Sequence, residues 1–258
     1  MLDGIRRFAP TAIVAIALLA LWFLLAQTVF AGRAYLVPGP IDVLSALGTD
    51  APNTFAATLT TLKEAALGYL AAIVLGVFIA AVLSQSRLLE RSVYPYAVLL
   101  QTVPIVAVAP LIVLWFGYDD LSVIIISLVI SIFPIINNTL LGLRSTSRNL
   151  LELFAMHHSS RMVRLVKLLL PSALPQIMAG LRISAGLSVI GAIIGEFIIG
   201  SGNSHGGLGV QIIFAQGRMY TALLFGEIIC ATLLGFLFFS IVNGAGNLML
   251  KNWHESAL

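Results

Sequence analysis

Long runs of apolar residues, separated by short polar segments, make up most of this sequence. A helix needs about 20 consecutive apolar residues to cross the hydrocarbon core of a membrane. The runs therefore predict six membrane-spanning helices, at about residues 11–31, 56–84, 93–117, 120–143, 172–200 and 220–248. Because the connections between them are short, the whole chain, 1–258, is expected to form one all-α integral membrane domain.

Composition narrows the class of protein further. Of the 258 residues, 59% are hydrophobic and 10% are charged, and the mean hydropathy is +1.03. An ordinary soluble domain has roughly 25% charged residues, so a soluble enzyme is excluded. The first apolar run, Thr11 to Phe30, is longer than the core of a signal peptide and lacks a clear cleavage site, which predicts that it is retained as the first span.

The basic residues indicate which connections face the cytoplasm, because Lys and Arg in short loops resist translocation. With a cytoplasmic N-terminus, the inner side holds Arg6, Arg7, Arg87, Arg91, Arg144, Arg148, Arg161, Arg164, Lys167 and Lys251, and the outer side holds Arg33, Lys63 and Arg218. This bias predicts that both termini are cytoplasmic. Arg182 lies inside the fifth span, where it is expected to reach the inner headgroups or to pair with a partner. The basic residues form no run with interleaved aromatics, so nucleic acid is not an expected partner.

The connections between the spans differ in kind. The stretch from Phe116 to Asp120 predicts a tight hairpin between the third and fourth spans. The outer stretch 32–53 contains a Pro-Gly-Pro turn followed by apolar spacing over 41–47, which predicts a short helix lying on the outer membrane face. The outer stretch 200–209 has five glycines and is expected to act as a hinge or docking loop. The inner stretch 145–170 is the longest cytoplasmic surface and mixes basic residues with apolar residues at helical spacing.

Motifs for catalysis are missing from the sequence. A nucleotide-binding P-loop needs Gly-Lys-Ser/Thr, but all three lysines follow Leu or Val. No His-Glu-x-x-His occurs, and His157 and His158 would point about 100° apart on a helix, which does not suit a shared metal ion. Cys230 is the single cysteine and cannot form an intrachain disulfide. We therefore expect no catalytic residue, no metal site and no cofactor in this chain.

Two acids, Glu196 and Glu227, lie near the outer ends of the fifth and sixth spans. Since an ionised carboxylate is costly in lipid, both should face the bundle interior, a partner or a watery path. A role in gating or solute contact and a structural hydrogen bond are both open for each. An acid/base or metal site formed by these acids with His205 is disfavoured by their different depths.

Prolines and polar residues in the third to fifth spans indicate a translocation pathway. Pro104, Pro110 and Pro134 each free a backbone carbonyl, which membrane helices tolerate where they meet protein or a cavity. With the two acids above, the candidate pathway residues are Gln101, Thr102, Asn137, Asn138, Ser188, Glu196 and Glu227. Packing around kinked helices explains the prolines equally well. Six glycines are expected to mark close helix approach, namely Gly68, Gly76, Gly180, Gly186, Gly191 and Gly195.

The inner stretch carries a specific resemblance. The segment from Asn149 to Arg161, followed by Leu168 to Pro175 and by Ala179-Gly180-Leu181-Arg182, resembles the EAA loop of binding-protein-dependent ABC importer permeases. In that family the loop forms a coupling helix that docks on a separate ATPase subunit, which binds ATP and Mg. The resemblance implies ATPase contact through Glu152, Leu153, Phe154, Ala155, Met156, His157, His158, Ser159, Ser160 and Arg161. The sequence departs from the family where His158 replaces the usual glycine, and where Leu153 and Phe154 replace small residues.

Further matches extend the resemblance over almost the full length. They include Leu36 to Pro40, Pro104 to Gly117, Ile190 to Phe197 and Gly206 to Gly209, and they look like the nitrate, sulfonate and taurine branch, which includes importers of pyrimidine and thiamine precursors. The resemblance implies a type I importer permease in a bacterial inner membrane. It also implies a homodimer of this subunit and an outer solute-binding protein, with a small polar or anionic solute. An ion-coupled secondary transporter using Glu196 and Glu227 is the alternative, disfavoured because no internal repeat is evident.

Overall fold

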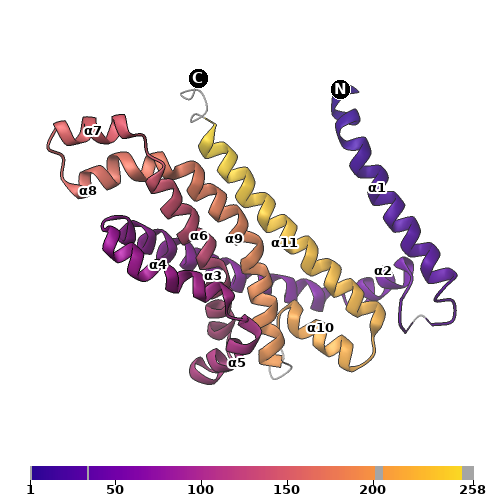
Figure 1. The fold of residues 1–258 in the computed structure, drawn as a ribbon. Coiled ribbons are helices and arrows are strands. Elements are labelled where there is room, and N and C mark those ends of the chain that lie inside the picture. The colour runs from indigo at the N-terminus through magenta and orange to yellow at the C-terminus, as the bar shows by residue number, and fades with distance from the viewer. Residues whose placement is uncertain (1, 34, 201–205, 252–258) are drawn as a thin grey trace.

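The structure is a computed structural model that describes residues 2–33, 35–200 and 206–251, and these residues form helices joined by short turns (Figure 1). In chain order the helices are α1 (Leu2–Gln27), α2 (Pro40–Thr49), α3 (Ala51–Ser84), α4 (Arg87–Thr102), α5 (Ile105–Phe116), α6 (Asp120–Arg144), α7 (Arg148–Met156), α8 (Arg161–Arg164), the π-helix η1 (Leu165–Leu169), α9 (Leu170–Ile199), α10 (Leu208–Gly217) and α11 (Thr221–Leu250). The expected all-α membrane fold is confirmed.

Four helical segments in the described part of the chain are long and apolar enough to cross a membrane. They are α3, α6, the continuous run of α8, η1 and α9, and α11. They confirm the second, fourth, fifth and sixth expected spans. The first expected span coincides with α1, which ends at Gln27, four residues earlier than predicted. The predicted outer helix and the hairpin at 117–119 are present as α2 and the α5–α6 turn.

The third expected span, 93–117, is not one continuous helix. It consists of α4 and α5, separated at Val103 and Pro104, which both have extended backbone angles. Pro104 has no N–H to donate within a helix, and its ring pushes the preceding residue out of the helical region. Pro95, Pro110 and Pro134, by contrast, lie inside continuous helices. The break leaves free backbone groups at the middle of the predicted span.

Close contact among α3, α6 and α9 forms the core. A Cβ added at Gly191 would lie 2.7 Å from the Cα of Ser127, and one added at Gly68 would lie 2.5 Å from the Ser127 hydroxyl oxygen. Similar steric limits apply at Gly76, Gly180 and Gly195, so five of the six glycines mark close helix approach as predicted. Gly186 is the exception, because a Cβ there would meet nothing within 4 Å.

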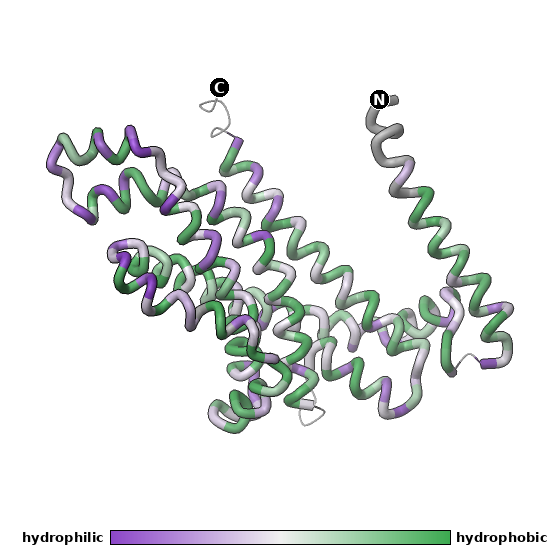
Figure 2. The backbone as a smooth tube through the Cα atoms, viewed as in Figure 1, coloured by the Kyte–Doolittle hydropathy of each residue, from purple (hydrophilic) through white to green (hydrophobic). Residues whose placement is uncertain are grey.

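The two ends of the bundle differ in charge and hydropathy. The beginning of α1, the end of α11 and the α7–α8 segment lie at the same end of the structure, whereas α5 and α10 lie toward the other (Figure 1). Hydrophobic residues cover most of α1 and α11, whereas hydrophilic and hydrophobic residues alternate in α7 and α8 (Figure 2). The α7–α8 end carries Arg144, Arg148 and Arg161 and is cytoplasmic by the distribution of basic residues. At the outer end Lys63 pairs with Asp120 at 3.0 Å.

Candidate functional site: the coupling helix and the pathway cavity

The helix α7 is short, amphipathic and exposed to the cytoplasm. The side chain of Leu151 packs on the buried cluster formed by Leu143, Leu165, Leu169, Ala173 and Ile177. Three other apolar side chains of α7 are exposed: Leu150, Leu153 and Met156 have exposed fractions of 42%, 43% and 71%. Glu152 is also exposed. An exposed apolar patch on a rigidly seated helix is typical of a protein interaction site.

His158 lies two residues after the end of α7 and has a left-handed backbone conformation. Its φ is 49°, its N–H donates to Ala155 O at 3.0 Å, and the N–H of Ser159 donates to Phe154 O at 3.3 Å. This pair of bonds is a Schellman motif, in which the left-handed residue is usually glycine because a side chain is strained there. The EAA resemblance leads us to expect a glycine at position 158. The left-handed backbone there gives the physical reason for that expectation.

After α7 the chain turns at residues 157–160 and then continues as one helical run through α8, η1 and α9. Ser160 caps α8 by accepting the N–H of Val163 at 3.3 Å, and the π-helix η1 joins α8 to α9. Leu165 and Leu169 of η1 are buried in the same cluster that holds Leu151. At this end Arg144 of α6 forms an ion pair with Glu90 of α4. Residues of α7, η1 and α9 therefore share one packed cluster at the cytoplasmic end.

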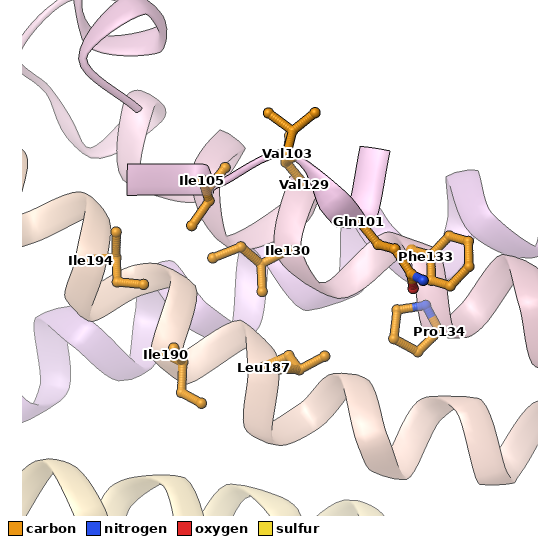
Figure 3. Close-up of a pocket in the computed structure, with 10 residues that line it drawn as sticks. All are labelled: Gln101, Val103, Ile105, Val129, Ile130, Phe133, Pro134, Leu187, Ile190 and Ile194. Carbon is orange, nitrogen blue, oxygen red and sulfur yellow. The ribbon is translucent and has the colours of Figure 1, made fainter. Parts of the chain in front are cut away.

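A cavity of about 380 Å³ lies beside the break between α4 and α5 (Figure 3). It is lined by Gln101, Val103, Ile105, Val129, Ile130, Phe133, Pro134, Leu187, Ile190 and Ile194. Gln101 is the only one of these ten with a polar side chain, and it lines the cavity together with Pro134 and Phe133 (Figure 3). The sequence-predicted polar residue Gln101 and the prolines Pro104 and Pro134 thus meet at one cavity or its edge.

The other polar pathway candidates lie away from the lining of this cavity. Asn137 accepts the hydroxyl of Tyr94 at 2.6 Å, and Asn138 donates to Pro134 O at 2.8 Å. Ser188 is fully buried, and its carbonyl accepts the hydroxyl of Ser127 at 2.9 Å in the α6–α9 contact. Thr102 is exposed and donates to Leu99 O. These residues therefore make hydrogen bonds within the subunit, either between packed helices or to the backbone of their own helix.

Glu196 holds the beginning of α10. Its side chain is 2% exposed, accepts the Thr61 hydroxyl at 2.7 Å and accepts the N–H of Gly209 at 2.6 Å. The Thr61 oxygen in turn accepts the N–H of Leu208 at 2.8 Å. The first N–H groups of a helix have no partner inside it, and a negative charge is favoured there. Glu196 and Thr61 therefore fix α10 to α9 and α3.

The sequence analysis overlooked Glu64, which lies 3% exposed next to Glu196. Both acids line one small cavity, together with Asp120 at the start of α6. A signal was available in the sequence. Small or polar residues recur every three or four positions along α3, at Thr54, Ala57, Thr61, Glu64 and Gly68, and all five are buried.

Glu227 forms a separate contact. It is fully buried in α11 and accepts the hydroxyl of Thr54 on α3 at 3.0 Å. Of the two interpretations left open for Glu196 and Glu227, these contacts favour the structural hydrogen bond. The candidate His205, with residues 201–204 of the glycine-rich loop, lies outside the described residues.

The combination of a short exposed cytoplasmic helix, a core of closely packed spans and a broken helix beside a cavity agrees with the sequence comparisons. A family model described as the inner membrane component of binding-protein-dependent transport systems matches residues 72–249. The chain belongs to this family. It is accordingly a multi-pass ABC importer permease of the inner membrane rather than an enzyme, with a fold that fits the type I arrangement.

Three similar permeases cover between 76% and 92% of this chain. The formylaminopyrimidine transport permease protein ThiX of Halalkalibacterium halodurans is 34% identical over 92% of this chain and 93% of its own length. A probable ABC transporter permease protein of Haemophilus influenzae is 37% identical over 92% of this chain and 95% of its own. The putative aliphatic sulfonates transport permease protein SsuC of Bacillus subtilis is 33% identical over 76% of this chain and 69% of its own. The chain thus falls among permeases of the nitrate, sulfonate and pyrimidine branch.

Proposed function

We propose that two copies of this chain form the translocation pathway of an ATP-driven importer, with an ATPase docked on α7 and a solute-binding protein on the outer side. The observation that carries the proposal is the packing of Leu151, on the exposed α7, against a buried cluster that η1 and the pathway helix α9 share. ATP and Mg belong to the ATPase in this proposal. Closure of two ATPases would move α7, and the packed η1 would pass that movement to α9 as a rigid-body rotation.

The residues from Glu152 to Arg161 are the proposed ATPase contact. Leu150, Leu153 and Met156 supply apolar surface, and Met162 of α8 extends it, being 67% exposed. Glu152 and Arg161 lie at the exposed rim of this surface. An apolar centre surrounded by polar residues is the usual arrangement of a specific protein interface.

We further propose that the cavity at Gln101 is part of the pathway and that it passes a flat, uncharged heterocycle better than a small inorganic anion. None of its ten lining residues is basic, and nine are apolar. Nitrate or a sulfonate would lose hydration there without gaining a cationic partner. A pyrimidine could stack on Phe133 and hydrogen-bond to the Gln101 amide. The similarity to the formylaminopyrimidine permease supports this class.

Uptake by the reconstituted complex tests the transport proposal. We expect ATP-dependent uptake of labelled formylaminopyrimidine into proteoliposomes that contain the chain, its ATPase and its binding protein, with little uptake of nitrate or taurine. Gln101→Leu should lower the uptake rate by about tenfold, because one lost hydrogen bond to a bound ligand costs about 1–1.5 kcal/mol. Thr102→Val, next to it but outside the lining, is the control. Uptake that needs a proton gradient and no ATPase would contradict the importer assignment.

The strained position of His158 gives a test of the coupling loop. His158→Gly should preserve ATPase association, because glycine adopts positive φ without strain. His158→Val should destabilise the end of α7 by about 1–2 kcal/mol, since a β-branched residue is disfavoured in the left-handed region. Hydrogen exchange of the α7 amides measures the effect.

The adjacent residue provides the control for this test. His157 has a φ of −83°, so His157→Val should leave the exchange rates almost unchanged. Equal rates for the valine variants at 157 and 158 would show that the left-handed conformation is not required.

A further inference from the structure

Arg182 is a cation within a membrane-spanning helix that the proposed transport cycle does not use. Its Nη2 donates to the Asn247 side chain of α11 at 2.7 Å, and its buried Nε has no partner. No ion pair joins Arg182 to any residue that the structure describes. A charged residue in this position usually has a partner in the bundle or at the headgroup level.

The surroundings of Arg182 offer donors suited to an anion. Asn247 is exposed and uses its carbonyl oxygen for Arg182, so its amide N–H groups point elsewhere. Lys251 follows Asn247 by four residues at the end of α11, and residues at this spacing lie on the same face of a helix. Arg182, Asn247 and Lys251 together form a group of donors at the cytoplasmic end of α11, the level of the inner headgroups.

An apolar groove between α9 and α11 begins one helical turn after Arg182, at Gly186 on α9. It has a volume of about 430 Å³ and is lined by Gly186, Val189, Ile190, Ile193, Phe197, Ile212, Ile228, Ala231, Thr232, Gly235 and Phe236. Ile228 and Phe236 are 47% and 70% exposed at its edge. At 1.5 Å per residue, the α9 side of the groove extends about 16 Å. Its open, apolar and elongated shape suits a hydrocarbon chain.

The donor group and the groove lie on the same side of α9. At about 100° per residue, Gly186, Val189 and Ile193 lie within about 40° of Arg182 around the helix. Leu187 and Ile194, which line the cavity at Gln101, lie about 120–140° away. The cation therefore faces the α9–α11 groove rather than the proposed solute pathway.

We propose that the α9–α11 groove binds one anionic phospholipid of the inner leaflet, with an acyl chain on the apolar lining and the headgroup phosphate on Arg182, Asn247 and Lys251. Charge complementarity favours this occupant, because phosphate oxygens accept hydrogen bonds and Arg and Lys at the inner interface attract anionic lipids. Bound lipid would hold α9 against α11 at the end where the coupling segment enters the membrane.

Native mass spectrometry of the delipidated full-length chain tests this proposal. The probes are dioleoylphosphatidylglycerol, dioleoylglycerol, which has the same chains without phosphate, and inorganic phosphate. We expect the phosphatidylglycerol to bind at least tenfold more tightly than the dioleoylglycerol, and inorganic phosphate not to compete at lipid-equivalent concentrations. Arg182→Gln should remove the preference for the phosphorylated lipid. Arg87→Gln, an exposed basic residue at the same end of the bundle, should retain it.

A second variant tests the groove without touching the cation. Gly186→Leu fills open space, since no atom lies within 4 Å of an added Cβ, and it should weaken phosphatidylglycerol binding about tenfold. Gly48→Leu, at another open helical glycine on α2, should not. Unchanged binding in Arg182→Gln would overturn the proposal. Competition by inorganic phosphate would also overturn it, because it would indicate a site for soluble anions. Release of the lipid when two copies associate would overturn it too, because it would assign the groove to the second copy.

Discussion

Replacing Glu196 by alanine is expected to lower the stability of the folded chain by about 3 kcal/mol. The buried carboxylate accepts bonds from the Thr61 hydroxyl and the Gly209 N–H, so its removal leaves the Gly209 N–H in the first turn of α10 without this partner. Hydrogen bonds to a charged group contribute about 1.5–3 kcal/mol, and a buried donor left unpaired costs about 1–3 kcal/mol. The measurement is the midpoint of thermal unfolding of the purified chain in one detergent.

Two further variants make this test specific. Thr61→Val keeps the shape of the side chain but removes the cap on Leu208, so it should cost about 1–2 kcal/mol. Glu152→Ala removes an exposed carboxylate on α7 and should leave the midpoint unchanged. A midpoint for Glu196→Ala equal to that of Glu152→Ala would show that the carboxylate does not hold α10.

Gly191→Ala is expected to have the second large effect. The added methyl group would lie 2.7 Å from the Cα of Ser127, a backbone atom that cannot move without separating α6 from α9. The same displacement would stretch the bond from the Ser127 hydroxyl to Ser188 O. Overpacking of this kind costs about 1–3 kcal/mol and more where backbone must move. The yield of monodisperse protein and the unfolding midpoint should both fall.

Gly186→Ala provides the matched control on the same helix. An alanine Cβ there meets nothing within 4 Å, so the variant should fold with a midpoint close to that of the wild type. If both alanine variants behaved alike, the close approach of α6 and α9 at Gly191 would not be needed for folding.

Helix positions could be predicted well where length and hydropathy decide them. The spans now seen as α6, α9 and α11 begin and end within two residues or so of their expected boundaries, because long apolar runs have no other way to satisfy their backbone in a membrane. The family resemblance pointed to residues 152–161, in the long cytoplasmic stretch between two such spans, and α7 overlaps the first half of that range. The break at Pro104 was not predicted. Proline alone does not decide it, because Pro110 and Pro134 stay within continuous helices.

Contacts between distant residues explain what the sequence analysis missed. Glu64 precedes Glu196 by 132 positions, and no local pattern reveals that the two acids line the same small cavity. The same holds for Thr54 and Glu227, which are 173 residues apart. Glu196 and Glu227 were recognised as unusual because charges in apolar spans are costly. Their hydrogen-bond partners could be found only once α3 was placed against α9 and α11.

Co-purification with the ATPase tests the central claim, that α7 couples this permease to ATP hydrolysis. The chain and its ATPase are co-expressed and purified in detergent, as wild type, Leu153→Asp, Glu152→Arg and Leu88→Asp. Leu88 is 76% exposed at the start of α4, at the same end of the structure but outside the coupling segment. We predict that the ATPase is retained by the wild type and Leu88→Asp and lost from Leu153→Asp and Glu152→Arg. Retention of an active ATPase by both α7 variants would contradict the assignment of the coupling helix.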